Sequence, residues 1–333
     1  MTEPAIKSIA PEPPADNAPR RHPYLSFALR VGLGVAVVGF LIWHYDAGPI
    51  FSQLRHEKIG FFLATAMLYL IGQAVSAWRW QLLARIAGIR GRYREYFAYT
   101  YIGMFTNLFV PGLIGGDAAR AVYLGRRHDL MGNAIASVVA DRAAGLIGVF
   151  WLAAACAVAI GRAIFPDSVM FPTAAVGVAS FAGWLAAPLI ARLVSSIGGR
   201  AGSLLTPIIP YLRRPFALIP AIVLSVLLQV ILASGQYLLA LGLGLHISPV
   251  LFMACVPIAN VFASLPITLN GLGVRETAYI LLFGMAGVSR GSAIALGLLW
   301  FASTMIAGLT GVVAFVTTET PTLVRVREAA EAK

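Results

Sequence analysis

Charged residues are scarce in this 333-residue chain. They make up 12% of the sequence and hydrophobic residues 59%, whereas soluble domains are roughly 45–50% apolar and about 25% charged. The composition excludes an ordinary soluble domain. Six long segments contain no Asp, Glu, Lys or Arg: 59–78, 96–116, 143–161, 168–191, 215–274 and 291–318. Because about 20 apolar residues cross a bilayer as a helix, the sequence predicts an all-α polytopic membrane protein.

Cysteine is nearly absent. The only two cysteines, Cys156 and Cys255, lie inside apolar segments, which excludes a disulfide framework and a cysteine-based metal site. The histidines show no metal-ligand spacing. A nucleotide loop is also missing, since Gly271-Leu-Gly273 is too short and lacks the strand-turn-helix context. We therefore expect no metal and no cofactor.

Acidic residues are few as well. The chain has 14 Asp and Glu against 25 Lys and Arg, for a net charge of +11. In a soluble protein this excess would suggest nucleic-acid binding. Here hydrophobic segments separate most of the basic clusters, which is the distribution that the positive-inside rule predicts for cytoplasmic loops. We expect no nucleic-acid partner and both termini on the cytoplasmic side.

Six full spans are predicted within a single transmembrane domain at 27–317. Residues 1–26 contain six prolines among small and polar residues, which predicts a disordered cytoplasmic tail. Residues 318–333 form a second cytoplasmic tail. The spans are expected near 27–45, 59–83, 131–161, 172–195, 216–245 and 291–317.

Two further apolar segments, 97–116 and 250–271, are broken by residues that interrupt helices. The interrupting residues are Asn107, Pro111, Gly112, Gly115 and Gly116 in the first, and Pro257, Asn260, Pro266, Asn270, Gly271 and, just beyond it, Gly273 in the second. Basic residues at both ends of the first segment predict a re-entrant hairpin that enters from the cytoplasm. The second segment enters from the outside. Either it is re-entrant and 274–289 is a short outer helix, or both cross, giving up to eight spans.

The two broken segments resemble each other. Residues 111–117 are similar to 266–273, and downstream 144–149 is similar to 307–312. Their order and spacing suggest an internal repeat, with half-repeats at approximately 59–161 and 216–317. Because the first broken segment enters from the inside and the second from the outside, the repeat would be inverted. Inverted repeats with broken helices are typical of secondary transporters.

Three charged pairs occur beside or within the apolar segments: Asp117/Arg120, Asp141/Arg142 and Arg275/Glu276. A charge at the centre of a bilayer costs about 2.5–3.5 kcal/mol on insertion scales and usually has a partner or faces a cavity. Asp117 and Arg120 are three residues apart and can meet on one helix face. The members of the other pairs are adjacent and point in different directions, so each needs a partner on another element.

Two interpretations of these charges remain open. They could be interfacial salt bridges that hold helix ends, or a buried polar site built by both half-repeats. The second is favoured by Asp117 and Arg275, which follow glycine-rich breaks where free N–H groups and an arginine can hold an anion. A carboxylate would compete with that anion, so Asp117 could instead neutralise Arg120 or Arg142 in the empty site. Arg79, between two tryptophans, is interpreted first as an interfacial residue, with a role at the substrate as the alternative.

In these residues the sequence resembles the lysylphosphatidylglycerol synthase transmembrane-region family, also called the flippase-like domain family. The resemblance spans 107–276, and the similar helix pattern continues to about 316. The motifs that carry it are Asn107-x3-Pro111-Gly112, Gly115-Gly116-Asp117-x2-Arg120, Ser137-x3-Asp141-Arg142-x2-Gly145-Leu146 and Pro266-x4-Gly271-x-Gly273-x-Arg275-Glu276. It implies a multi-pass protein of a bacterial or archaeal inner (plasma) membrane.

The resemblance also implies a role in lipid movement. In the best-known multidomain members this region is thought to flip aminoacylated phosphatidylglycerol, but the soluble aminoacyl-transferase domain that follows it there has no counterpart in this chain. We therefore expect a stand-alone member that is not an enzyme and acts on membrane lipids, either polar or anionic, with glycolipids and lipids of hopanoid pathways among them. The expected head-group site comprises Asn107, Asp117, Arg120, Asp141, Arg142, Arg275 and Glu276, and the expected backbone breaks are Pro111, Gly115, Gly116, Pro266, Gly271 and Gly273.

The leading functional hypothesis is a lipid translocator whose arginines hold an anionic group while its acidic residues balance charge. A membrane-embedded transferase is the first alternative, although the few carboxylates each lie close to an arginine, which suits charge compensation better than metal binding. An accessory subunit of a lipid, glycolipid or hopanoid biosynthesis complex is the second alternative.

Overall fold

The computed structural model describes residues 59–109, 114–160, 167–197, 199, 202, 205–263 and 271–318, and its regular structure there is entirely helical. The expected all-α class is confirmed. The predicted first span at 27–45, the tail at 1–26 and the C-terminal tail beyond Thr318 lie outside the described residues.

Within the described ranges, five helical stretches are long and apolar enough to cross a membrane. They correspond to the five predicted spans that fall within the described part of the chain. The helices are α3 (Ile59–Ile86), α6 (Met131–Ile160), α7 (Asp167–Ser195), α10 (Ile219–Gly242) with the preceding 3-10 turn η3 (Pro215–Leu218), and α13 (Arg290–Leu309) continued by α14 (Gly311–Thr317).

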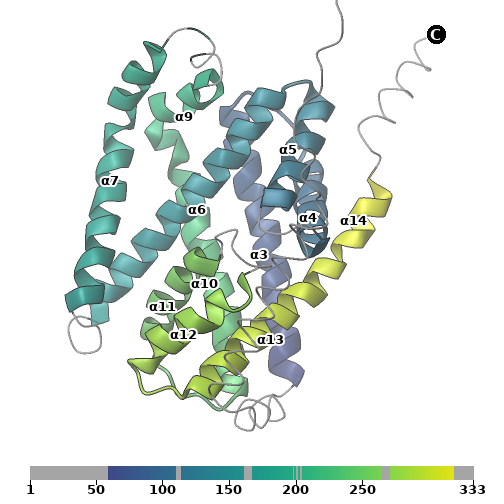
Figure 1. The fold of residues 1–333 in the computed structure, drawn as a ribbon. Coiled ribbons are helices and arrows are strands. Elements are labelled where there is room, and N and C mark those ends of the chain that lie inside the picture. The colour runs from purple at the N-terminus through teal and green to yellow at the C-terminus, as the bar shows by residue number, and fades with distance from the viewer. Residues whose placement is uncertain are drawn as a thin grey trace, which may run out of the picture.

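Helices α3 and α10 pack against each other along the centre of the bundle (Figure 1). Small residues allow this close contact, as is usual between membrane helices. A Cβ atom on Gly72 would lie 3.1 Å from a methyl group of Leu232. The Thr65 hydroxyl on α3 donates a 2.8 Å hydrogen bond to the carbonyl oxygen of Gly235 on α10. The pair forms the scaffold around which the shorter helices are placed.

Two pairs of short helices lie where the sequence predicts broken segments. The first pair is α4 (Tyr93–Phe109) with α5 (Ile114–His128), and the second is α11 (Pro249–Ala263) with α12 (Val274–Gly284). The members of each pair pack together. With 11 to 17 residues, each helix is shorter than the roughly 20 residues that cross a bilayer. In the described part of 250–289 the chain forms two short helices, α11 and α12, that pack against each other.

The two hairpins enter the bundle from opposite ends. In Figure 1, α4 and α5 occupy the upper half and α11 and α12 the lower half. The helix order long, short, short, long therefore occurs twice, in α3–α6 (the first unit) and in α10–α13 (the second unit), with opposite directions. The contacts between units also correspond, because α6 packs on α10 and α11 whereas α13 packs on α3 and, with α14, on α4. This arrangement is the one expected of an inverted repeat.

Arginines gather at one end of the bundle, the top of Figure 1. Helices α3, α5, α7 and the short α9 (Ile209–Arg213) each carry arginine in the last turn: Arg85, Arg126 with Arg127, Arg192 and Arg213. This is the end that the sequence predicts on the cytoplasmic side from the positive-inside rule. Helix α7 lies outside the two units and packs against α6, α9 and η3.

Labelling of introduced cysteines tests the opposed hairpins. Arg94→Cys and Arg126→Cys place thiols at the outer ends of α4 and α5, and Ser248→Cys and Ala286→Cys flank α11 and α12; all four positions are exposed. We expect the first two to react with an impermeant maleimide from one side of the membrane and the last two from the other side only, which is the result that a re-entrant hairpin at each end of the bundle predicts.

The labelling needs a starting variant in which no native thiol can react with the maleimide. Cys255 is buried and Cys156 is half-buried, so both are first replaced with Ala. Reaction of Arg94→Cys and Arg126→Cys from opposite sides would show that the first hairpin spans the membrane.

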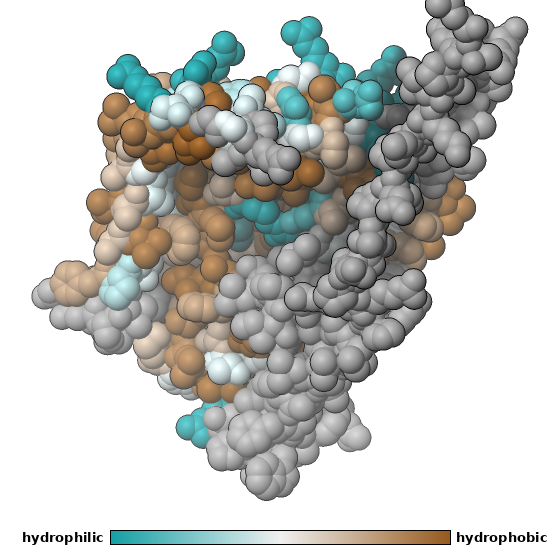
Figure 2. Space-filling view, turned by 45° about the horizontal axis from the view of Figure 1, so that its top comes forward, coloured by the Kyte–Doolittle hydropathy of each residue, from teal (hydrophilic) through white to brown (hydrophobic). Residues whose placement is uncertain are grey.

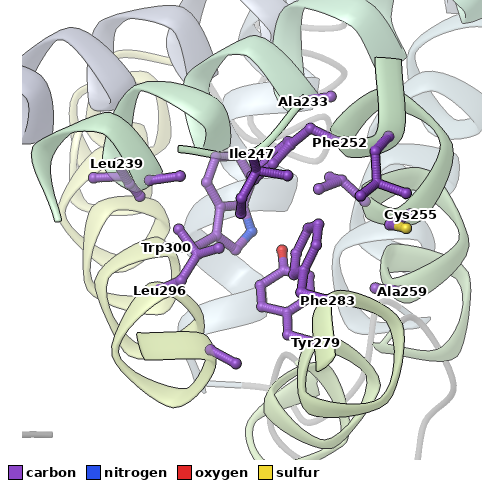
Figure 3. Close-up of a cluster of buried hydrophobic side chains, with 14 of the residues drawn as sticks. Ala233, Leu239, Ile247, Phe252, Cys255, Ala259, Tyr279, Phe283, Leu296 and Trp300 are labelled. Atoms are coloured by element: carbon purple, nitrogen blue, oxygen red, sulfur yellow. The ribbon is translucent and has the colours of Figure 1, made fainter. Parts of the chain in front are cut away.

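An aromatic cluster holds the second hairpin in place (Figure 3). Phe252 of α11 stacks on Phe283 of α12 with ring centroids 4.9 Å apart. Tyr279 of α12 packs beside Phe283 and donates its hydroxyl to the Gln236 side chain of α10. Because these contacts fix the rotation of α12, they also fix the direction of the residues in its first turn.

Candidate functional site

A cavity of about 320 Å³ lies between the two units. The tips of both hairpins reach it, with Asn107 and Gly116 from the first and Asn260 and Arg275 from the second. Since the hairpins come from opposite ends, the cavity lies inside the bundle and not at either end. Figure 2 shows a hydrophilic area recessed within a largely hydrophobic surface. The charged residues that line the cavity are Arg79, Asp117, Arg120, Asp141, Arg142 and Arg275.

The first unit contributes a chain of ion pairs from three helices. One carboxylate oxygen of Asp141 on α6 accepts a 2.8 Å hydrogen bond from Nε of Arg79 on α3. The other oxygen lies 3.4 Å from the Arg120 guanidinium on α5. Arg120 also contacts Asp117 at 2.6 Å, and the second oxygen of Asp117 accepts from Nε of Arg142 at 2.5 Å. The predicted pairing of Asp117 with Arg120 is present, and Asp141 and Arg142 find their partners on other helices, as expected.

Burial differs along this chain of ion pairs. The side chains of Arg79 and Arg120 are each 7% exposed and that of Asp141 is 3% exposed. Arg79 also donates to the Ser225 hydroxyl of α10 at 3.0 Å, and the Arg120 guanidinium lies 4.9 Å from the ring centroid of Trp80. Arg142 differs, because 43% of its side chain is exposed. The inner members therefore form a fixed framework, and Arg142 is its accessible end.

The second unit contributes Arg275 from the first turn of α12. Its Nε donates to the Asn260 side chain on α11 at 3.4 Å. Its Nη1 is buried and has no hydrogen-bond partner among the described residues. An unsatisfied buried donor costs about 1–3 kcal/mol, and more for a charged group. A guanidinium left in this state beside a cavity is a candidate ligand for an anion.

The glycines of the predicted breaks have two different roles. Gly115 and Gly116 lie inside the first turn of α5 and have no positive φ, so the prediction that they interrupt the helix is wrong. Gly116 instead allows a close approach, since a Cβ atom there would lie 2.5 Å from the carbonyl oxygen of Gly103 on α4. The amide of Gly116 donates to the Asn107 side chain at 2.7 Å, which ties the hairpin together at its tip.

Gly271 and Gly273 do break the backbone, with φ values of +76° and +85°. Side chains rarely adopt this left-handed region, and glycine adopts it readily. Gly273 immediately precedes α12 and Gly271 packs against Ala263 at the end of α11. The predicted breaks at Pro111 and Pro266 lie outside the described residues.

The structure separates Glu276 from the other predicted site residues. Glu276 is fully buried and does not line the cavity. Its carboxylate accepts a 2.6 Å hydrogen bond from the amide of Gly273, as in a capping box, and packs on Gly297 of α13. Its expected role as a head-group ligand is therefore wrong, and Glu276 caps α12 instead. The other six predicted residues all line the cavity.

Arg79 is a cavity residue that the sequence interpretation placed first at the membrane interface and only as an alternative at the substrate site. The structure favours the alternative, because its guanidinium is buried against Asp141 and lines the cavity. A signal was present: Arg79 is the only charged residue in the predicted span 59–83, and Asp141 lacked a partner on its own helix. Uncharged cavity residues that were missed include Tyr69, Gln73, Thr100, Gln229 and Thr304.

Comparisons with known proteins agree with this architecture. The family described as Lysylphosphatidylglycerol synthase TM region matches residues 27–311. The chain is also similar to a UPF0104 membrane protein of Methanothermobacter thermautotrophicus, with 25% identity over 295 residues that cover 79% of this chain and 86% of that protein. Every charged residue of the cavity falls within the region matched by the family.

Proposed function

The chain belongs to the lysylphosphatidylglycerol synthase transmembrane-region family, and from this premise we propose that it is a flippase-like lipid translocator that moves a polar or anionic lipid between leaflets. The observation that carries the proposal is the charged cavity inside an otherwise apolar bundle. Charges at membrane depth are expensive and are usually retained at sites for substrates or ions. Here six of them converge from four helices on one cavity.

The two opposed hairpins suggest how a head group could pass. The tip of α4–α5 and the tip of α11–α12 both contribute to the cavity wall, one from each end of the bundle. Movement of one hairpin would open the cavity toward one side, and movement of the other would open it toward the other side. The head group would occupy the cavity while the acyl chains remain in the surrounding bilayer.

We propose transport and not catalysis for this site. All four carboxylate oxygens of Asp117 and Asp141 contact arginines, so these carboxylates act as counter-ions. Transport would be driven by a proton or ion gradient or by downhill lipid movement. In line with the basic end described above, we propose the bacterial or archaeal inner (plasma) membrane as the location, with both termini on the cytoplasmic side.

Reconstitution tests the proposal. Purified full-length protein is inserted into phosphatidylcholine vesicles that contain a trace of a fluorescent lipid, and an impermeant quencher reports how much label reaches the outer leaflet. We expect faster exchange of at least one polar or anionic lipid than in protein-free vesicles. Arg94→Gln, which removes an exposed arginine outside the cavity, is the matched control and should retain the activity. Unchanged exchange for every lipid of a broad panel would refute the proposed function.

A further inference from the structure

The distribution of charge in the cavity points to the class of head group. Four arginines and two aspartates line it, an excess of two positive charges among the lining residues. Resting on the proposed function, we propose that the lipid carries an anionic phosphate group, which is held by Arg142 and Arg275 from the two units and displaces Asp117 from Arg142.

Among the described residues that line the cavity, no carboxylate is free for a cationic head group. Each oxygen of Asp141 contacts an arginine, Arg79 on one side and Arg120 on the other. Each oxygen of Asp117 does the same, with Arg120 and Arg142. An ammonium group would have to displace a guanidinium from these pairs and would add a further positive charge to a cavity that already has an excess. Selection therefore operates against cationic lipids as well as for anionic ones.

Donors for an anion are available from both units. Nη1 of Arg275 is buried and has no hydrogen-bond partner in the part of the chain that the structure describes, and Arg142 is the most exposed arginine of the ion-pair chain. The side-chain oxygen of Asn107 accepts a hydrogen bond from the amide of Gly116, and that of Asn260 accepts one from Nε of Arg275. Their side-chain amide groups remain as further donors in the cavity wall. A phosphate accepts several such bonds at once, and guanidinium groups match it in planar, bidentate geometry.

Asp117 acts in this arrangement as an internal counter-ion. In the structure it bridges Arg120 and Arg142. Arg120 would keep Asp141 as a partner if Asp117 moved away, whereas Arg142 has no second carboxylate as a hydrogen-bond partner among the described residues. A phosphate can therefore replace Asp117 on Arg142 and leave the buried framework intact. Return of Asp117 would help to release the lipid, because it restores the pair when the head group leaves.

Lipid competition tests this proposal. Phosphatidylcholine vesicles that contain the full-length protein receive a trace of fluorescent phosphatidic acid, fluorescent phosphatidylglycerol or a fluorescent trimethylammonium lipid, and both binding and exchange are measured. We expect the two anionic lipids to bind and exchange faster than the cationic one. Arg275→Lys should weaken binding of the anionic lipids about tenfold or more, because a point charge replaces a bidentate contact. Its thermal stability should stay near that of the wild type.

The Asp117→Asn variant separates a counter-ion from a purely structural residue. Without the competing carboxylate, anionic lipid should bind more tightly and exchange more slowly, since tight binding hinders release. A structural role would instead lower both quantities together. Arg94→Gln serves again as the control for loss of an exposed positive charge. Preference for the cationic lipid, or weaker anion binding by Asp117→Asn, would overturn this proposal while the translocator function stands; no exchange of any lipid would overturn both.

Discussion

Replacing Asp141 with Asn should strongly destabilise the protein and abolish transport. Asp141 is the shared counter-ion of Arg79 and Arg120, and all three side chains are almost fully buried. Asparagine keeps the shape but directs an N–H group toward one of the guanidinium groups and removes the negative charge. Breaking a buried ion pair by changing one partner costs about 3–5 kcal/mol, because a charge remains without compensation. Thermal denaturation of the detergent-solubilised protein measures this loss.

Two further variants show whether the buried charge is the cause. Glu95→Gln removes a carboxylate at the end of the bundle, where Glu95 contacts His128 at 3.0 Å and is one-quarter exposed; it should cost at most about 1 kcal/mol. The double variant Arg79→Gln, Asp141→Asn removes one buried positive charge together with the carboxylate, and it should be more stable than Asp141→Asn alone. Wild-type stability of Asp141→Asn would mean that Arg79 and Arg120 have other compensation.

Gly271→Ala should produce the second large effect: it should lower the free energy of unfolding by about 2–5 kcal/mol and abolish transport. Two costs combine at this position. A left-handed residue with a Cβ atom costs about 1–2 kcal/mol, and Gly271 has a φ of +76°. The added Cβ atom would also lie 2.5 Å from Cβ and 2.7 Å from the carbonyl oxygen of Ala263, and such overpacking costs about 1–3 kcal/mol. Thermal stability and lipid exchange are both measured.

Matched glycines separate these two costs. Gly287 has a φ of +78° but open space where a Cβ atom would be, so Gly287→Ala should show only the backbone cost. Gly116 is helical but packs against the carbonyl oxygen of Gly103, so Gly116→Ala should show only the packing cost and alter the tip of the first hairpin. Equal stability of Gly271→Ala and Gly287→Ala would show that the contact with Ala263 is not important.

Much of the helical arrangement could be predicted because its causes are local. Apolar segments of sufficient length predicted α3, α6, α7, α10 and α13, and Pro and Gly residues predicted the interrupted segments. The i,i+3 spacing placed Asp117 against Arg120, since neighbouring turns of one helix determine that contact. The positive-inside rule could not decide how many times residues 250–289 cross the membrane, because this region of the chain has too few basic residues.

That this is a helical membrane protein, that its long helices lie where they do, and that charges follow the two broken segments can all be read from the amino-acid sequence. Which of these charges meet depends on how the helices pack. Arg79 and Asp141 are 62 residues apart and pair because α3 and α6 are rotated toward the same cavity. Such rotations are not readable from helices that are apolar on every side, since no polar face marks the buried direction. Arg275 and Glu276 are adjacent, yet the packing of α12 directs one into the cavity and the other against Gly297.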